Sequence, residues 1–337
     1  MMKKCLIAFS VLLCAVCVIA KDPLNAYVPA DSIFAGTADG YALLQSKCYN
    51  SFLFAATQKT LEDQLKEMGK TLQQAKNESG IGVFFFKIKS VAPQIQTEGG
   101  AVIRGVTGTS FASMQNLTLK SAEAELKKSG LSLAMLQQYG MKLEIIKIEG
   151  KSALLLSCAE PVIQIAMIGV SGNQMQVRFA LGAPVEKKLF RPLPRHARSV
   201  LTKELQYKSL FSLAANIPAI VKLGGQEAAQ DPVAKSLKTV SASVNETNDK
   251  LVLQAKVDTV SADSANMIQA QLKAMVEQMK ANPQTKTLAE MVQINTVGNT
   301  VNLKAAMPVD YLLAMMAQFA MAAQQQQQAP AAAPAGK

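Results

Sequence analysis

The fold is decided by residues 240–257, which read Val240-Ser241-Ala242-Ser243-Val244-Asn245-Glu246-Thr247-Asn248-Asp249-Lys250-Leu251-Val252-Leu253-Gln254-Ala255-Lys256-Val257. Apolar residues recur at every second position on both sides of the polar stretch 247–250. A period of two is typical of a strand with one buried face, and a short polar connection between two such runs is typical of a β-hairpin. We therefore predict an antiparallel hairpin here.

The residues after this hairpin favour a helix and a second hairpin. A helix is predicted over 261–280, because its apolar residues form one stripe. A further hairpin is predicted around Gly298-Asn299, and Pro308 and Asp310 begin an apolar helix that ends near Met321. The stripe on the first helix consists of Ile268, Leu272, Met275, Val276 and Met279.

The first half of the chain has the same order of elements. Strands are predicted at 83–89 and 101–107, with Gly99-Gly100 in the connection between them. A helix at 121–139, broken near Ser129-Gly130, precedes a hairpin with a Glu149-Gly150 turn. Another hairpin joins 162–170 to 174–181, and the second run alternates as a strand with one buried face does. An amphipathic helix is also predicted between Thr60 and Gly80.

Hairpins joined by single helices are typical of antiparallel sheets with helices packed on one face. The predicted fold class is therefore α+β, with two related hairpin–helix–hairpin units. We divide the chain into a signal peptide (1–20), an N-terminal α+β domain (21–185), a basic, proline-containing linker (186–210), a C-terminal α+β domain (211–321) and a disordered Gln/Ala/Pro tail (322–337).

The first twenty residues predict export. Lys3 and Lys4 precede an apolar run over 5–19, and Val18 and Ala20 occupy the −3 and −1 positions of a small-residue cleavage site. The run is short for a bilayer, and no stop-transfer pattern follows it. We therefore expect a periplasmic or secreted protein with no transmembrane span after cleavage.

Two cysteines, Cys48 and Cys158, remain after cleavage. In an oxidising compartment they can form one disulfide bridge, and the alternative is two buried free thiols. The sequence leaves both alternatives open.

The predicted layout gives one resemblance to known proteins. Val28-Pro29-Ala30-Asp31 stands directly before a strand-like run at 33–37. With this opening, residues 27–321 resemble a diffuse group of exported bacterial α+β proteins of unknown function. The resemblance implies the fold and no activity.

The motifs of common catalytic, cofactor and metal sites are missing. His196 is the only histidine, so a histidine-rich zinc site is excluded and a catalytic triad has no partner suggested by the sequence. Gly150-Lys151-Ser152 resembles the end of a phosphate loop, but Ile145 stands where that loop needs glycine. The chain contains neither a G-x-S-x-G nor an S-x-x-K motif. We therefore predict a non-enzymatic protein with no catalytic, cofactor-binding or metal-binding residues.

Residues 186–210, called the basic segment below, are the strongest anomaly in composition. Their basic residues outnumber the acidic ones, and the mature chain carries 33 basic and 24 acidic side chains, a net charge of +9. An anionic partner such as a lipid headgroup or an acidic cell-wall polymer can bind such a segment, but a solvated linker has the same composition. Nucleic acid is not expected, because aromatic side chains for base stacking are sparse among the charges. The candidate anion contacts are Lys187, Lys188, Arg191, Arg195 and Arg198.

The sequence thus predicts an exported, non-enzymatic protein with a binding or structural role in the cell envelope, in contact with an anionic partner through the basic segment. The alternative is a secreted hydrolase whose catalytic residues cannot be recognised in the sequence. The sequence does not fix the oligomeric state.

Overall fold

A computed structural model describes residues 24–49, 81–91, 94–104, 118–128, 132–170, 174–224, 229–283 and 285–312, and a few single positions elsewhere. The predicted signal peptide, the helix between Thr60 and Gly80, most of the last helix and the tail lie outside the described residues.

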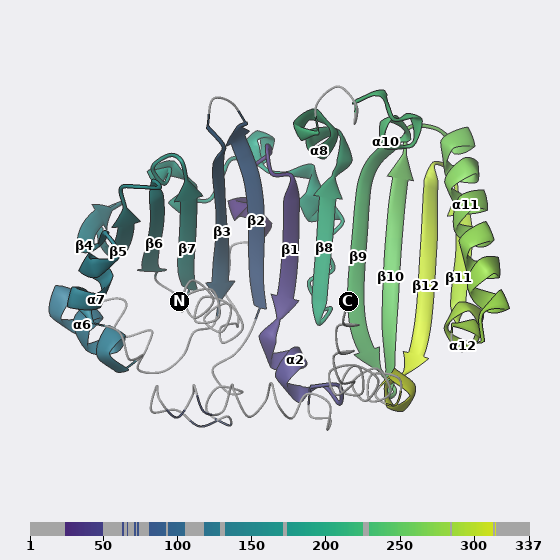
Figure 1. Ribbon diagram of the computed structural model, residues 1–337, viewed down its shortest axis with the longest axis horizontal. Helices are drawn as coiled ribbons and strands as arrows, with labels where there is room; N and C mark the ends of the chain where they lie inside the picture. The colour runs from purple at the N-terminus through teal and green to yellow at the C-terminus, as the bar shows by residue number, and fades with distance from the viewer. Residues whose placement is uncertain are drawn as a thin grey trace, which may run out of the picture.

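The described strands form one antiparallel sheet in the order β11-β12-β10-β9-β8-β1-β2-β3-β7-β6-β5-β4 (Figure 1). The α+β class is confirmed, but the plural sheets of the prediction are one sheet, because β1 pairs with β8 and joins the two halves of the chain. The division into two domains stays a prediction. The strands are β1 (Phe34–Asp39), β2 (Ile81–Ser90), β3 (Gln96–Arg104), β4 (Met141–Ile148), β5 (Lys151–Cys158), β6 (Ile163–Val170), β7 (Gln174–Leu181), β8 (Phe211–Asn216), β9 (Leu237–Thr247), β10 (Lys250–Thr259), β11 (Val292–Val297) and β12 (Thr300–Pro308).

Helices lie at both ends of the sheet and at the ends of its central strands (Figure 1). The α-helices are α2 (Gly40–Gln45), α6 (Leu119–Lys128), α7 (Leu133–Gln138), α8 (Ile217–Leu223), α10 (Pro232–Ser236), α11 (Ala262–Ala281) and α12 (Lys286–Glu290). The 3₁₀ helices are η1 (Leu24–Tyr27), η3 (Lys187–Phe190), η4 (Arg195–Ala197) and η5 (Val200–Lys203). Within the part of the chain that the structure describes, none of these helices has the length and apolarity needed to cross a bilayer.

The predicted hairpins have the turns that their sequences favour. Asn248 and Asp249 both have positive φ angles, 51° and 59°, and so do Glu149 and Gly150, 55° and 74°. Two consecutive residues with positive φ match the right-handed twist of the flanking strands. The predicted helix after β10 is α11, and the Ser261 hydroxyl accepts a hydrogen bond from the Ser264 amide at its N-terminus.

The two halves of the chain begin in a similar way, but β4–β7 follow the helices of the first half and only β11 and β12 those of the second. β1 ends at Asp39, whose carboxylate caps α2, and β8 ends at Asn216, whose side chain caps α8. A hairpin and a helix follow in each half. The last strand then pairs with the second strand of that hairpin, β7 with β3 and β12 with β10. A relation between the two units by sequence stays a prediction.

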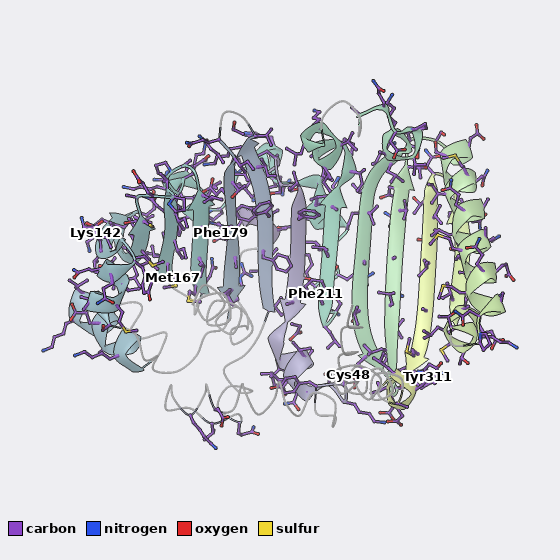
Figure 2. The ribbon with its side chains drawn as sticks, in the orientation of Figure 1. Cys48, Lys142, Met167, Phe179, Phe211 and Tyr311 are labelled. Carbon is purple, nitrogen blue, oxygen red and sulfur yellow. The ribbon has the colours of Figure 1, made fainter. Side chains whose placement is uncertain are left out.

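The two faces of the sheet have different covers. On the helix face, α11 packs Ala265 and Ile268 against Val301. The same face carries Met167, Phe179 and Phe211 farther along the sheet (Figure 2). The other face, called the segment face, is covered at its centre by η1 and the basic segment. The apolar contacts there include Val28, Leu189 and Leu201 against Val83, Phe85 and Val102.

The structure overturns two predictions, one about β7 and one about β3. β7 does not have one buried face, because Gln176 and Arg178 are 1% and 0% exposed on the side that was predicted to meet solvent. Gly99 and Gly100 lie inside β3 rather than in a connection. A Cβ atom on Gly99 would lie 2.2 Å from Phe179 Cζ, so the strand needs glycine where a neighbouring side chain crosses it.

Candidate functional site

The basic segment is packed on the sheet rather than exposed along its length. Leu189, Phe190 and Leu201 are buried at 2%, 5% and 0% exposure. Its backbone is hydrogen-bonded to the chain around η1: the Leu193 amide donates to the Ala26 carbonyl and the Ser199 amide to the Val28 carbonyl. Its apolar residues therefore belong to the core.

The five predicted anion contacts fall into two groups. Lys188 is 3.0 Å from Glu186, Arg191 is 2.6 Å from Glu149, and the Arg198 guanidinium donates to the Leu193 carbonyl at 2.7 Å. Lys187 and Arg195 are exposed. Part of their charge is therefore neutralised within the chain, and their contact with an anion stays a prediction.

No disulfide joins Cys48 and Cys158, so the bridge that the sequence left open is not formed. The Cys48 amide donates to Glu246 on β9, and Cys158 ends β5, seven strands away in the sheet. Adjacent strands are about 4.8 Å apart, so roughly 30 Å separates the two residues, whereas a disulfide needs Cα atoms within about 7 Å. Figure 2 shows Cys48 below the central strands. Burial raises the pKa of the Cys48 thiol to about 11, which makes the thiolate scarce at neutral pH.

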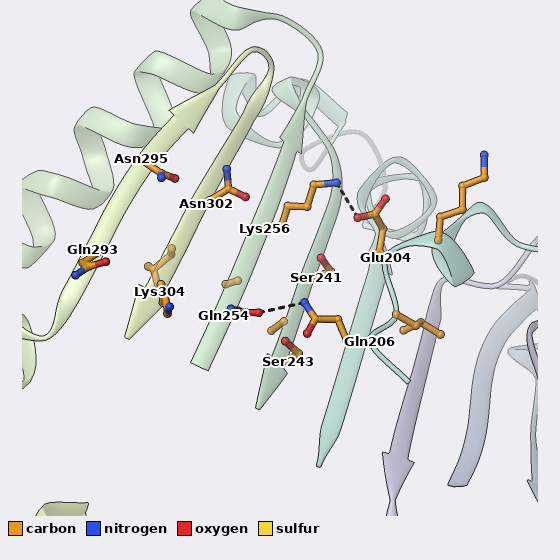
Figure 3. A pocket seen from close by; sticks show the side chains of 15 residues that line it. Glu204, Gln206, Ser241, Ser243, Gln254, Lys256, Gln293, Asn295, Asn302 and Lys304 are labelled. Carbon is orange, nitrogen blue, oxygen red and sulfur yellow. Dashed lines mark hydrogen bonds and ion pairs between the residues drawn. The ribbon is translucent and has the colours of Figure 1, made fainter. Parts of the chain in front are cut away.

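A groove of about 430 Å³ lies on the segment face (Figure 3). The end of the basic segment forms one wall, and strands β9, β10, β12 and β11 form the floor. The lining residues are Lys203, Glu204, Leu205, Gln206, Ser241, Ala242, Ser243, Gln254, Ala255, Lys256, Gln293, Asn295, Asn302, Leu303 and Lys304. We call this site the polar groove.

Strand register arranges the polar side chains of the floor in two rows. One row crosses the four strands as Asn295, Asn302, Lys256 and Ser241. The second row is Gln293, Lys304, Gln254 and Ser243. Directly opposed residues have neighbouring side chains, so the floor of the groove presents amides, hydroxyls and two ammonium groups side by side.

Ser243 has an unusual position in this floor. Its residue is 2% exposed, and its hydroxyl oxygen has no hydrogen-bond partner among the described residues. A buried hydroxyl without a partner is costly, and most such groups in folded proteins are satisfied. Ser243 is therefore a buried polar group under the groove that the described residues leave unsatisfied.

Lys256 lies at the centre of an ion-pair network between the wall and the floor. Its ammonium is 2.8 Å from Glu204 and 3.1 Å from Asp258. Burial alone would lower the pKa of Lys256, but its hydrogen bonds to Glu204 and Asp258 raise that pKa above its ordinary value. Hydrogen bonds from Thr300 and Thr239 help to lower the pKa of Asp258 despite its burial. Lys256 and Asp258 are therefore both ionised at neutral pH.

The groove is also positively charged. Lys203, Lys256 and Lys304 line it against the single carboxylate of Glu204. It contains no aromatic side chain, so a ligand is held there by hydrogen bonds and charge rather than by stacking. Across the described residues, no group of three His, Cys, Asp or Glu side chains is placed to hold a metal ion.

A second set of charges is buried where the basic segment begins. The buried charge cluster consists of Lys87, Lys89, Glu98, Arg178 and Glu186. Glu98 is 0% exposed and lies 2.7 Å from the Lys89 ammonium and 3.6 Å from that of Lys87. Its other carboxylate oxygen accepts the Glu186 amide at 3.0 Å. The cluster thus ties the start of the basic segment to β2 and β3.

Within this cluster, Arg178 fills the space beside the other four side chains. Its guanidinium lies 4.7 Å from the centroid of the Phe85 ring and 5.6 Å from that of Phe190, and it donates to the Leu189 carbonyl. A Cβ atom on Gly100 would lie 2.2 Å from Arg178 Nη1, which explains the second glycine of β3. Burial lowers the pKa of Arg178 to about 9, and Glu98 opposes that shift.

Comparisons with known proteins find structural similarity alone. No protein-family model and no curated protein matches the sequence. The chain is similar to crystal forms I, III and IV of TP0453, a Treponema protein, with TM-scores of 0.41, 0.42 and 0.40 and 10%, 11% and 11% identity. The matches cover 89%, 89% and 88% of this chain and 98%, 99% and 97% of those chains. At these TM-scores the likeness carries no conclusion about the fold or the activity of this chain.

Proposed function

We propose that this protein is an exported, non-enzymatic binding protein that holds an anionic, hydroxyl-bearing component of the cell envelope in the polar groove. The observation that carries the proposal is a groove lined by amides, hydroxyls and three lysines against a single carboxylate. Export is supported by the signal pattern of residues 1–20.

The chemistry of the lining favours this class of ligand. Amides and hydroxyls both donate and accept hydrogen bonds, so they suit the hydroxyls of a saccharide or a polyol. The Lys304 and Lys203 ammonium groups supply charge for a carboxylate or phosphate. Lys203 also belongs to the basic segment, so the groove includes part of the surface from which an anion contact was expected. A lipid headgroup and an acidic polymer share this chemistry.

The hydrolase alternative is disfavoured by the protonation of Lys256. Ser241 and Lys256 are opposed in the β9–β10 ladder, which is the pairing that a Ser–Lys dyad requires. A lysine acts as the base of such a dyad only when its pKa is lowered. Here the hydrogen bonds to Glu204 and Asp258 raise the pKa, so Lys256 carries its proton.

Binding tests the proposal with two sources of the same chemistry. The full chain is titrated at low salt with polygalacturonate and, separately, with vesicles of phosphatidylglycerol; neutral dextran and phosphatidylcholine vesicles are the uncharged controls. We expect at least one anionic probe to bind and both uncharged probes to fail. Binding to polygalacturonate alone assigns an acidic polymer, and binding to phosphatidylglycerol alone assigns a headgroup.

Variants locate the binding in the groove. Lys203→Gln combined with Lys304→Gln removes two groove ammonium groups and should weaken binding by at least tenfold. Lys142→Gln, at the opposite end of the sheet (Figure 2), is the matched control and should bind like the unaltered protein. Equal binding by the groove variant and the control would refute the proposal.

A further inference from the structure

The two edge strands of the sheet differ in how they are protected. An unpaired edge can add a strand from another chain, and proteins usually block it with charged side chains, proline or a bulge. β4, at one end, carries Lys142, Glu144 and Lys147. β11, at the other end, reads Val-Gln-Ile-Asn-Thr-Val and pairs with β12 without a register shift. β11 therefore carries no charged side chain, proline or bulge, and α11 packs on its helix face.

The hairpin fixes which backbone groups of β11 face outward. A two-residue turn, Gly298-Asn299, connects β11 to β12, and such a hairpin closes on a hydrogen-bonded pair, here Val297 with Thr300. Hydrogen-bonded pairs alternate along an antiparallel ladder, so Asn295 and Gln293 also bond to β12. The amides and carbonyls of residues 292, 294 and 296 consequently point away from the sheet. Among the described residues these groups have no hydrogen-bond partner.

We propose that this edge pairs antiparallel with β11 of a second copy of the chain, which makes one continuous sheet across a two-fold axis. The strand is complementary to itself when Ile294 pairs with Ile294 of the partner. Val292 then faces Thr296, and Gln293 faces Asn295, so β-branched side chains meet β-branched ones and amides meet amides. Three pairs of residues exchange two hydrogen bonds each across the axis.

Charge also favours a second copy at this edge. The whole chain carries a net charge of +11, yet no charged side chain lies on β11. Two copies therefore meet through an uncharged strand. The two-fold axis is perpendicular to the sheet, so both segment faces point the same way. If the proposed ligand binding holds, the two polar grooves form one longer surface suited to an extended polymer.

Proline substitution at the edge tests the pairing. Thr296→Pro removes an outward amide and no bond to β12, and proline is tolerated on edge strands in this position. The unaltered chain should show a mass twice that of the monomer by light scattering and sedimentation, and Thr296→Pro should weaken association by at least tenfold. The matched control is Lys147→Pro, which removes an outward amide from β4 next to its own two-residue turn and should still dimerise.

Charge pairs test the register without touching the core. Gln293 and Asn295 are exposed, and in the proposed register each faces the other across the axis. Gln293→Glu with Asn295→Lys creates attractive pairs and should dimerise, whereas Gln293→Lys with Asn295→Lys creates repulsive pairs and should stay monomeric. A monomeric unaltered chain at high protein concentration, or equal association by both double variants, would overturn the proposal. Neither outcome depends on ligand binding.

Discussion

Removing the negative charge of Glu98 should destabilise the fold strongly. Glu98→Gln keeps the size of the side chain and the oxygen that accepts the Glu186 amide, so the substitution changes charge and little else. In the native protein the Glu98 carboxylate lies within 3.6 Å of Lys89 and Lys87 and is fully buried. The variant removes the carboxylate that compensates the fully buried Arg178, whereas Lys87 keeps its contacts with Asp31 and Glu186.

The magnitude follows from two opposed terms. At an effective dielectric constant of about 20, unit charges roughly 3 Å apart attract by about 5 kcal/mol. The substitution also removes the cost of burying the carboxylate, which offsets part of this loss. Breaking a buried ion pair from one side typically costs about 3–5 kcal/mol, so we expect a loss of about 3 kcal/mol in the free energy of unfolding. That is a large fraction of the roughly 5–15 kcal/mol that stabilises most domains.

Urea unfolding followed by circular dichroism measures this loss. The matched control is Glu144→Gln, because Glu144 lies 2.7 Å from Lys142 with side-chain exposures of 38% and 72%. An exposed pair contributes at most about 1 kcal/mol, so the control should unfold close to the native midpoint. A loss below about 1 kcal/mol for Glu98→Gln would refute the inference that the cluster is held together by this carboxylate.

Three further changes have expected outcomes. Ser243→Ala should stabilise the free protein by about 1 kcal/mol in thermal unfolding, because it removes a buried hydroxyl without a partner, and it should weaken the binding of the anionic probe; destabilisation would show that the hydroxyl is already satisfied. Burial alone would raise the pKa of Glu186, but nearby lysines including Lys89 lower it to about 2, so its contribution to stability is complete above about pH 4.5 and is lost as the pH falls towards 2. In the Glu186→Gln variant, the free energy of unfolding should depend less on pH between 4.5 and about 2. An unchanged pH dependence would contradict this assignment. Gly100→Ala should lower stability by about 1–3 kcal/mol in urea unfolding, because its Cβ would lie 2.2 Å from Arg178 Nη1; a neutral effect would mean that the arginine moves aside.

Local patterns in the sequence predicted most of the elements correctly. The Asn248-Asp249 and Glu149-Gly150 turns were recognised because residues that tolerate positive φ stood between two alternating runs. The helix after Ser261 was recognised because its apolar stripe and its cap are both local signals. These elements depend on neighbours within a few positions, which a single sequence displays.

The buried polar residues were missed because burial depends on distant parts of the chain. Gln176 and Arg178 alternate with apolar residues, and that pattern indicates a solvent face only when nothing else covers it. The cover comes from η1, which lies far away in the sequence, and from the basic segment. The glycines of β3 were placed in a turn for the same reason, since nothing local indicates that Phe179 and Arg178 cross that strand.

The polar groove was missed because each of its residues is ordinary by itself. Ser241, Ser243, Gln254 and Lys256 read as the exposed side of a hairpin, and the structure does place them on one face. Only the order β9-β10-β12-β11 brings this face next to Asn302 and the other amides to form two continuous rows. The available signal was that serine and amide side chains fill the outward positions of the two rows except at Lys256 and Lys304.

The joint between β1 and β8 explains why the basic segment packs where it does. Ala35 and Ala214 are paired there and are both 0% exposed, so small side chains leave room for another layer directly above the joint. Val28 and Leu201 fill that layer, and the Ser199 amide bonds to the Val28 carbonyl beside them. The segment that connects the two halves in sequence therefore also covers the contact between them. A chain whose connection only linked two independent domains would gain nothing from burying Leu201 completely, so the segment holds the halves in one sheet.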